Sequence, residues 1–201
     1  MSAHRDVGRF DEWASTYDRS YLQRLVFEPV QRTLLQVAAT AKPRATAILD
    51  VGCGTGRLLR AAEGLFPGAR LEGVDAAPAM VKRAQAESDS GITFRQGVAE
   101  QLPFGEAEFD LVFSTMTFHH WADQGRGAAE VARVMRADGR WLLAEFVPKG
   151  ILRLLMARRF PRQRSLERML REEALEIMSQ RSVPGLGGQV EIIVIGKRDL
   201  R

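Results

Sequence analysis

Residues able to hold a polar ligand gather after the first predicted strand of the chain. An apolar stretch at 46–50 ends in Asp50, and three glycines follow at alternate positions, Gly52, Gly54 and Gly56. Glycine has no Cβ, so such a turn lets the main chain approach a ligand closely. The turn also directs the free N–H groups of the following helix towards whatever binds there. A glycine-rich turn that holds no ligand is the alternative.

A second carboxylate stands at the end of the next predicted strand. Residues 70–74 lead into Asp75, and a helix is predicted at 78–88. A strand, a glycine turn, a helix and a strand ending in an acid are typical of one nucleotide-binding half of a doubly wound sheet. The Asp75 carboxylate can accept charge-assisted hydrogen bonds from both hydroxyls of a ribose. Alternatively, Asp75 caps the helix that follows it.

The spacing of the glycines narrows the choice of nucleotide. The dinucleotide fingerprint G-x-G-x-x-G would place its third glycine at Arg57, whereas this chain has G-x-G-x-G. A phosphate-binding P-loop ends in Gly-Lys followed by Ser or Thr, and residues 52–58 contain no lysine. The turn therefore lacks the usual signatures for a pyrophosphate or a triphosphate.

Two adjacent histidines follow the fourth predicted strand. His119 and His120 come five and six residues after the apolar run 109–114. Imidazole titrates near neutral pH, so one of them could act as a general base at the end of that strand. The alternative is that both rings pack against the loop or hydrogen-bond within it.

Strands and helices alternate along the part of the chain that positions these residues. Strands are predicted at 46–50, 70–74, 92–96, 109–114 and 141–147, and helices at 24–41, 56–65, 78–88 and 124–136. The near-continuous apolar run at 109–114 is typical of a strand buried on both faces. The alternation predicts an α/β fold, a doubly wound and mostly parallel Rossmann-like sheet with helices on both faces. Asp138-Gly139 is predicted to turn the chain into the fifth strand.

The last fifty residues depart from this alternation. Residues 150–180 are predicted to be helical with a division at Pro161, followed by a short strand at 180–183, a glycine loop and a strand at 190–195. Two strands joined by a glycine loop indicate an antiparallel hairpin at the sheet edge. Counting both, we expect seven strands in one domain over 1–201. Its parts are 1–41 with N-terminal helices, 42–148 as the binding core, and 149–201 as a variable helical segment with the hairpin.

The glycine turn matches a known family motif. Residues 50–56 read Asp-Val-Gly-Cys-Gly-Thr-Gly, and the first motif of class I S-adenosylmethionine-dependent methyltransferases is D-x-G-x-G-x-G. The chain resembles that family. The resemblance implies S-adenosyl-L-methionine as cofactor, with the turn against its methionyl part and sugar and with Asp75 and Ala76 at the ribose.

Two further segments are similar to family motifs. Residues 97–104 resemble G-D-A-x-x-L-P-F, which borders the adenine, but Val98 replaces the acid that commonly receives the adenine amino group. Main chain near Ala99, or the Glu100 side chain, is the substitute that the resemblance suggests. The segment that begins at Ser114 corresponds to the stretch that passes under the sulfonium and opens towards the methyl acceptor.

The beginning of the chain resembles a lid found in one branch of the family. Residues 10–18 match F-D-x-x-A-x-x-Y-D, which closes over the cofactor in the small-molecule branch that includes ubiquinone and menaquinone C-methyltransferases. Tyr17 would then lie close to the transferring methyl group and join His119 and His120 as a catalytic candidate. An amphipathic helix that packs on the sheet is the alternative.

The resemblance therefore implies in-line methyl transfer to a small-molecule acceptor. Two other classes stay open on sequence alone: an accessory protein that holds the cofactor without catalysis, and a nicotinamide-dependent oxidoreductase. The glycine spacing opposes the oxidoreductase. The DNA-amino methylating signature is missing after the fourth strand, where Ser114 is followed by Thr-Met-Thr, so no nucleic-acid partner is expected.

The charge and the cysteine content limit which partners and which cellular setting are expected. The net charge is +4, and basic residues are densest at 149–171, among several apolar ones. Such a segment suits either a solvated helix face or contact with a lipid-like or anionic acceptor or a membrane surface. The single cysteine, Cys53, fits a reducing, cytoplasmic setting. No apolar run is long enough to span a membrane, and no histidine–cysteine cluster has zinc spacing.

Overall fold

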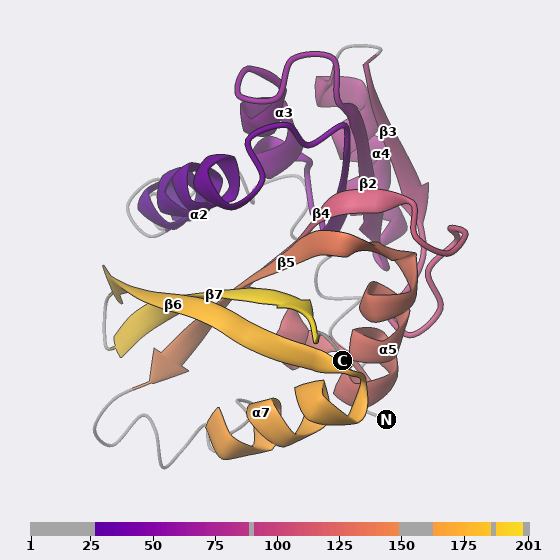
Figure 1. Cartoon of the computed structure of the whole chain (residues 1–201). Coiled ribbons are helices and arrows are strands. Elements are labelled where there is room, and N and C mark those ends of the chain that lie inside the picture. Colours follow the sequence, from indigo (N-terminus) through magenta and orange to yellow (C-terminus); the bar gives the residue numbers. More distant parts are fainter. Residues whose placement is uncertain (1–26, 89–90, 149–162, 186–187, 199–201) are drawn as a thin grey trace.

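A seven-stranded sheet forms the centre of the molecule. The computed structural model describes residues 27–88, 91–148, 163–185 and 188–198. The strands are β1 (Ala47–Val51), β2 (Arg70–Asp75), β3 (Ile92–Gln96), β4 (Phe109–Thr115), β5 (Met135–Pro148), β6 (Leu175–Gly185) and β7 (Gly188–Lys197). Their order in the sheet is β3-β2-β1-β4-β5-β7-β6, and β7 runs antiparallel to both of its neighbours (Figure 1). The predicted doubly wound sheet with an antiparallel C-terminal hairpin is confirmed.

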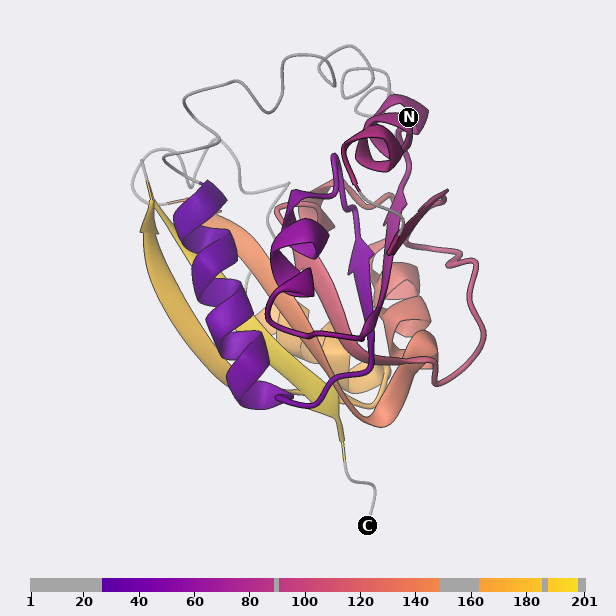
Figure 2. The ribbon, with the colours of Figure 1, turned by 90° about the horizontal axis from the view of Figure 1, so that it is seen from above.

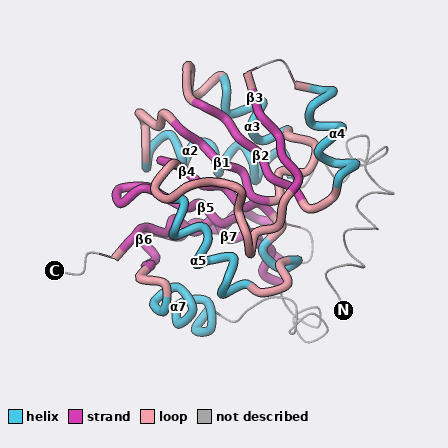
Figure 3. The backbone as a smooth tube through the Cα atoms, turned by 90° about the vertical axis from the view of Figure 1, so that its right-hand side faces the viewer, coloured by secondary structure: helices cyan, strands magenta, loops and turns pink. Residues whose placement is uncertain are grey.

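Helices cover both faces of this sheet, as the alternation of elements predicts. They are α2 (Glu28–Ala41), α3 (Arg57–Glu63), α4 (Pro78–Glu87), α5 (Gln124–Val134) and α7 (Gln163–Glu172). The apolar faces of α2, α3 and α4 join one core cluster, and those of α5 and α7 join the other. Figure 2 and Figure 3 show how these helices are arranged about the sheet. The sheet is thus the middle of three layers.

The central strands are buried because both of their faces meet a helix layer. All residues of β1 are buried, and β4 is buried from Phe109 to Ser114. Phe113 points into the core of α2 and α3, whereas Val112 and Trp141 point into the core of α5 and α7. Each such large side chain contributes about 1.5–3 kcal/mol through its burial. The packed core holds the carboxyl ends of the strands in fixed positions.

The C-terminal prediction was wrong about where the helix ends. Helix α7 stops at Glu172, and β6 begins at Leu175, so residues 175–180 form a strand and not a helix. Ala174 turns the chain with a positive φ of 53°, and the N–H of Arg198 donates to its carbonyl. The glutamates around Leu175 favour a helix locally, but pairing along the length of β7 satisfies the main chain of this segment and overrides that propensity.

The predicted turn at Asp138-Gly139 is instead an irregularity within β5. Phe109 pairs with Met135 and Leu111 pairs with Arg140, so β5 holds extra residues between the two pairs. A Cβ on Gly139 would lie 2.5 Å from Met135 and 3.1 Å from the Phe109 carbonyl oxygen. The glycine lets the two chains approach where the extra residues are accommodated.

Several predicted features lie outside the described residues. These are the N-terminal lid at 10–18 with Tyr17, the first residues of the helix predicted at 24–41, and residues 149–162 with Pro161.

Candidate functional site

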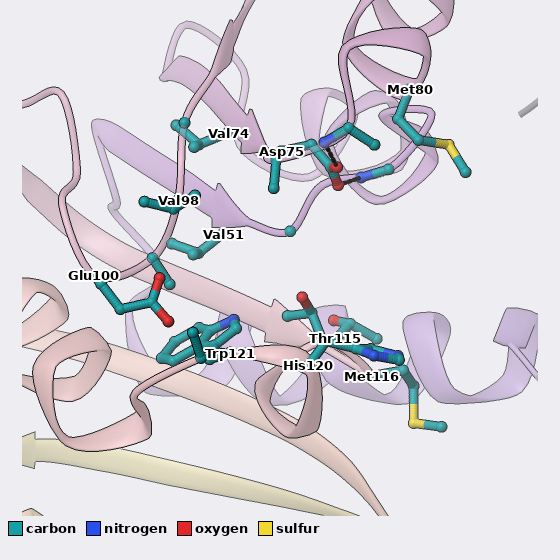
Figure 4. Close-up of a pocket in the computed structure, with 18 of the residues that line it drawn as sticks. Val51, Val74, Asp75, Met80, Val98, Glu100, Thr115, Met116, His120 and Trp121 are labelled. Carbon is teal, nitrogen blue, oxygen red and sulfur yellow. Dashed lines mark hydrogen bonds between the residues drawn. The ribbon is translucent and has the colours of Figure 1, made fainter. Parts of the chain in front are cut away.

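A cavity of about 460 Å³ opens at the carboxyl ends of β1, β2 and β4. Its walls come from the glycine turn, the end of β2, the loop 97–100 and the segment 115–123 (Figure 4). A doubly wound sheet binds its ligands at this edge, and small-molecule sites have volumes of about 300–1,000 Å³. The four segments that the sequence indicated therefore meet around one cavity.

The three glycines of the turn share a positive φ but serve different purposes. A Cβ on Gly52 would lie 2.1 Å from the Thr117 hydroxyl oxygen, and one on Gly56 would lie 2.6 Å from the Phe94 ring. Gly52 thus lets the turn meet the chain after β4, and Gly56 lets α3 pack closely on β3. A Cβ on Gly54 would have no atom within 4 Å. Gly52 and Gly54 line the cavity.

Asp75 lines the cavity and also supports the turn. Its Oδ2 accepts the Gly54 N–H at 2.8 Å, and its Oδ1 accepts the Ala77 N–H at 2.9 Å (Figure 4). Ala77 is the N-cap of α4 and has no side-chain cap, so Asp75 is not the capping residue of that helix. A carboxylate oxygen accepts more than one hydrogen bond, so these contacts are compatible with a ligand. Ala76 lines the cavity beside it.

Asp50 lies below the turn and is buried rather than exposed to the cavity. Its Oδ1 has no hydrogen-bond partner within the described parts of the chain. Burial, together with the charge of Asp75, raises the pKa of Asp50 to about 8. Burial and the same two aspartates raise the pKa of Cys53, which keeps this thiol protonated and unreactive.

The loop after β3 supplies one wall of the cavity. Val98, Ala99 and Glu100 all line it, and Val98 is 47% exposed. The Glu100 carboxylate accepts the N–H of Asp123 at 3.0 Å. Asp123 in turn caps α5 by accepting the N–H of Arg126, which also lines the cavity. The loop after β3 is thereby tied to α5, a link that no sequence motif indicates.

The end of β4 reaches the cavity one residue later than predicted. Ser114 is buried beneath it and accepts the indole N–H of Trp141 at 3.2 Å. Thr115, Met116 and Thr117 line the cavity instead. The Thr115 hydroxyl is buried without a partner among the described residues. Met116 has a φ of 57°, which is rare for a bulky side chain and is typical of functional sites.

The two histidines lie in different surroundings. Both belong to the short 3-10 helix η3 (Phe118–His120), but His120 lines the cavity and His119 does not. His119 Nδ1 lies 2.8 Å from Oε1 of Glu145, a residue on β5 that the sequence did not indicate. The two imidazole rings have centroids 4.0 Å apart.

The described ranges contain neither a candidate metal site nor a candidate membrane-spanning helix. No group of three histidine, cysteine, aspartate or glutamate side chains in them could hold a metal ion. No helix of these ranges combines the length and the apolar character needed to cross a bilayer.

Comparison with known proteins identifies the domain. Residues 49–143 match the family described as Methyltransferase domain. The chain is 37% identical over 150 residues to a nocamycin O-methyltransferase from Saccharothrix syringae, covering 72% of this chain and 52% of the relative. It is 31% identical over 148 residues to a demethylmenaquinone methyltransferase from Chlorobaculum parvum, covering 70% and 60%. The chain thus spans less than two thirds of the length of either relative.

A solved structure confirms the fold. The 1,6-didemethyltoxoflavin-N1-methyltransferase of Burkholderia thailandensis, with bound 1,6-didemethyltoxoflavin and S-adenosylhomocysteine, superposes with a TM-score of 0.73 at 22% identity. The match covers 98% of this chain and 89% of that one. The matched family and the relatives show that residues 49–143 of the chain are a methyltransferase domain, and the fold of the solved structure agrees with this.

Proposed function

We propose that this chain transfers a methyl group from S-adenosyl-L-methionine to a small-molecule acceptor. The observation that carries the proposal is the cavity edge at Gly54, where the turn leaves open space and Asp75 holds the main chain in place. The cofactor, when bound, supplies a methyl group already activated on a positively charged sulfur. The protein then has to align the two reactants and exclude water.

The residues around the cavity fit this cofactor. Asp75 offers carboxylate oxygens for the ribose hydroxyls, and Gly52 and Gly54 let a methionyl group approach the main chain. Val98 and Ala99 offer an apolar wall for the adenine ring. The unpartnered hydroxyl of Thr115, which lines the cavity at the end of β4, provides a polar group that a bound ligand or water can satisfy.

The histidines supply a place for a proton that the acceptor loses. His120 lines the cavity and the His119 ring packs against it at a tilt, so this pair is the proposed proton acceptor. The names of the two relatives, a nocamycin O-methyltransferase and a demethylmenaquinone methyltransferase, support a small organic acceptor.

The described part of the basic segment favours a solvated helix face over a membrane contact. Leu166 and Leu170 of α7 are buried in the core, whereas Arg164, Arg168 and Arg171 are exposed. This is the pattern of an ordinary amphipathic surface helix. The acceptor is therefore proposed to reach the site from solution.

Calorimetric titration with S-adenosylhomocysteine tests the cofactor site. The wild-type chain is expected to bind, and Asp75→Ala is expected to weaken binding at least about a hundredfold, since charged hydrogen bonds and the support of the turn are both lost. Asp75→Asn keeps one acceptor oxygen and should bind with intermediate affinity. Asp138→Ala, which removes an exposed aspartate at the opposite sheet edge, is the matched control. A folded wild-type chain that does not bind would overturn the proposal.

Methyl transfer itself can be measured with cofactor labelled in the methyl group. The labelled cofactor is incubated with the chain and the low-molecular-weight fraction of a cell extract. We expect label in small organic products. Binding of the cofactor without any transfer would instead support the non-catalytic alternative.

A further inference from the structure

Glu145 stands out as a buried carboxylate beside the proposed reaction centre. It follows Ala144 on β5, and the Ala144 carbonyl accepts the N–H of Met116, a residue that lines the cavity. Its side chain is 9% exposed. A buried carboxylate is costly unless a positive charge or several donors face it.

Both oxygens of Glu145 hold His119. Oε1 lies 2.8 Å from the ring nitrogen Nδ1, and Oε2 accepts the backbone N–H of His119 at 3.2 Å. Oε1 also accepts the N–H of Phe146 at 2.9 Å. A carboxylate facing Nδ1 places the proton of the neutral ring on that nitrogen, so Nε2 keeps its lone pair. The contact therefore sets both the tautomer and the orientation of the ring.

A second buried glutamate allows a structural role of such a carboxylate to be distinguished from a role in proton transfer. Glu191 on β7 stands directly opposite Glu145 and is equally buried. Its carboxylate is held by neutral donors, the side chains of Gln180, Ser182 and Gln189. Like charges directly opposite in a sheet are destabilising. Neutral donors are enough to hold Glu191 in the fold, whereas Glu145 faces a ring that can become positively charged.

On this basis, and resting on the proposed methyl transfer, we propose that Glu145 is the positioning residue of a Glu145–His119–His120 unit that receives the acceptor's proton. The acceptor is then a hydroxyl compound or a protonated nitrogen, and not a carboxylic acid, because a carboxylate has already lost its proton at neutral pH.

The step balances in atoms and charge. The acceptor's O–H or N–H proton moves to an imidazole nitrogen as its lone pair forms the bond to the methyl carbon. The carbon–sulfur bond breaks, and sulfur keeps that electron pair and becomes a neutral thioether. Glu145 compensates the positive charge that the histidine pair acquires, and the proton leaves to solvent afterwards. Among the described residues, the other charged groups that line the same cavity are Asp75, Glu100, Asp123 and Arg126, and Glu191 stands opposite Glu145.

Nitrogen-15 NMR tests the unit without any acceptor. The chain has three histidines, so His119→Gln and His120→Gln assign both rings. The wild type is expected to show His119 with its proton on Nδ1. In Glu145→Gln the side-chain amide can donate to Nδ1 as well as accept from it, so we expect part of the population to carry the ring proton on Nε2. Glu191→Gln should keep the wild-type tautomer. A wild-type proton on Nε2, or the same tautomer in both variants, overturns the proposal.

Transfer of labelled methyl groups to the small-molecule fraction of a cell extract tests the chemistry. Glu145→Gln should lower the maximal rate at pH 7 by at least tenfold with unchanged affinity for S-adenosylhomocysteine, and the loss should shrink at high pH, where the acceptor ionises unaided. Glu145→Asp should restore part of the rate, and Glu191→Gln should match the wild type. If the wild type transfers and Glu145→Gln transfers equally well at every pH, Glu145 has no such role.

The stability of the product tests the acceptor class. Methyl esters release labelled methanol in mild alkali, whereas methyl ethers and N-methyl groups do not. We expect alkali-stable label, and release as methanol overturns the acceptor class. A wild type that neither binds S-adenosylhomocysteine nor transfers label would refute the proposed function instead, and the NMR result on Glu145 would still stand by itself.

Discussion

Two buried aspartates lie at opposite edges of the central strands and differ in how they are satisfied. Asp110, at the amino end of β4, accepts the N–H and hydroxyl of Thr46 at 2.8 Å each and the N–H of Ala47 at 3.0 Å, and it pairs with Arg136 at 2.9 Å. Burial opposes its charge, but these partners outweigh burial and lower the pKa of Asp110. Asp50, at the carboxyl end of β1, has an unpartnered oxygen and a raised pKa of about 8.

The contrast indicates a division of labour between the two edges of the sheet. At the amino edge, polar groups are satisfied by the protein itself and stabilise the fold. At the carboxyl edge, where the ligand site is proposed, the buried oxygens of Asp50 and Thr115 have no partner among the described residues, and the fold tolerates their cost. The following substitutions test that division, in order of expected effect.

Replacing Asp110 should have the largest effect. Asp110→Ala leaves Arg136 and two main-chain N–H groups without their acceptor and should lower the free energy of unfolding by about 3 kcal/mol. Urea denaturation measures it. Asp138→Ala removes an exposed ion pair with Lys42 and should cost less than about 1 kcal/mol. Equal losses in the two variants would contradict a special role for the amino edge.

Replacing Asp50 should stabilise the ligand-free chain in a pH-dependent way. The folded-state pKa of about 8 lies above the ordinary value of 3.8. Ionisation of Asp50 therefore does not affect the free energy of unfolding below pH 3.8, and it lowers that free energy increasingly as the pH rises to about 8. Asp50→Asn should therefore be more stable than the wild type by about 2 kcal/mol at pH 8, allowing for the buried amide, with no gain at pH 4. Thermal unfolding across this range shows whether the gain grows with pH, and a constant difference would count against the assignment.

Alanine substitutions at two glycines distinguish the effect of backbone strain from the effect of contact with a ligand. Gly54 and Gly68 both have a positive φ, and a Cβ on either would meet no atom within 4 Å. Alanine at each should cost about 1 kcal/mol of stability. Gly54→Ala alone should weaken S-adenosylhomocysteine binding, by about tenfold, because its methyl group enters the cavity. Unchanged affinity in calorimetry would show that the ligand does not approach the turn.

The smallest expected effect concerns Val98, in the wall proposed to contact adenine. Val98→Asp restores the acid that the family motif commonly carries there and should tighten S-adenosylhomocysteine binding by about fivefold, or about 1 kcal/mol. Leu65→Asp is the control, since Leu65 is 48% exposed and Val98 47%, but Leu65 does not line the cavity. Weaker binding by Val98→Asp would place the adenine amino group elsewhere.

The proposed cofactor half of the site could be located from the sequence because its signals are local. Gly52, Gly54 and Asp75 lie within one strand–turn–helix–strand unit, and the chain has little freedom in how such a unit folds. The prediction for strand β3 matches its observed bounds, residues 92–96, for the same reason. The role of Tyr17 stays a prediction, because it lies outside the described residues.

The acceptor half was not predictable in the same way. Ser114 and Thr115 are neighbours of similar chemistry, and only the packing of Trp141 on β4 shows that Ser114 is buried and Thr115 faces the cavity. The strand character of residues 175–180 likewise depends on β7, because local propensity favoured a helix.

By itself, the amino-acid sequence determined the strand–helix alternation, the glycine turn and the family, since each depends on residues close together in the chain. Tertiary structure alone decided that His119 meets Glu145, twenty-six residues away, and that Asp110 ties β4 to Thr46, sixty-four residues away. Contacts of this kind leave no periodic or spaced pattern in the sequence. They exist because the order and register of the strands bring distant side chains to the same edge of the sheet.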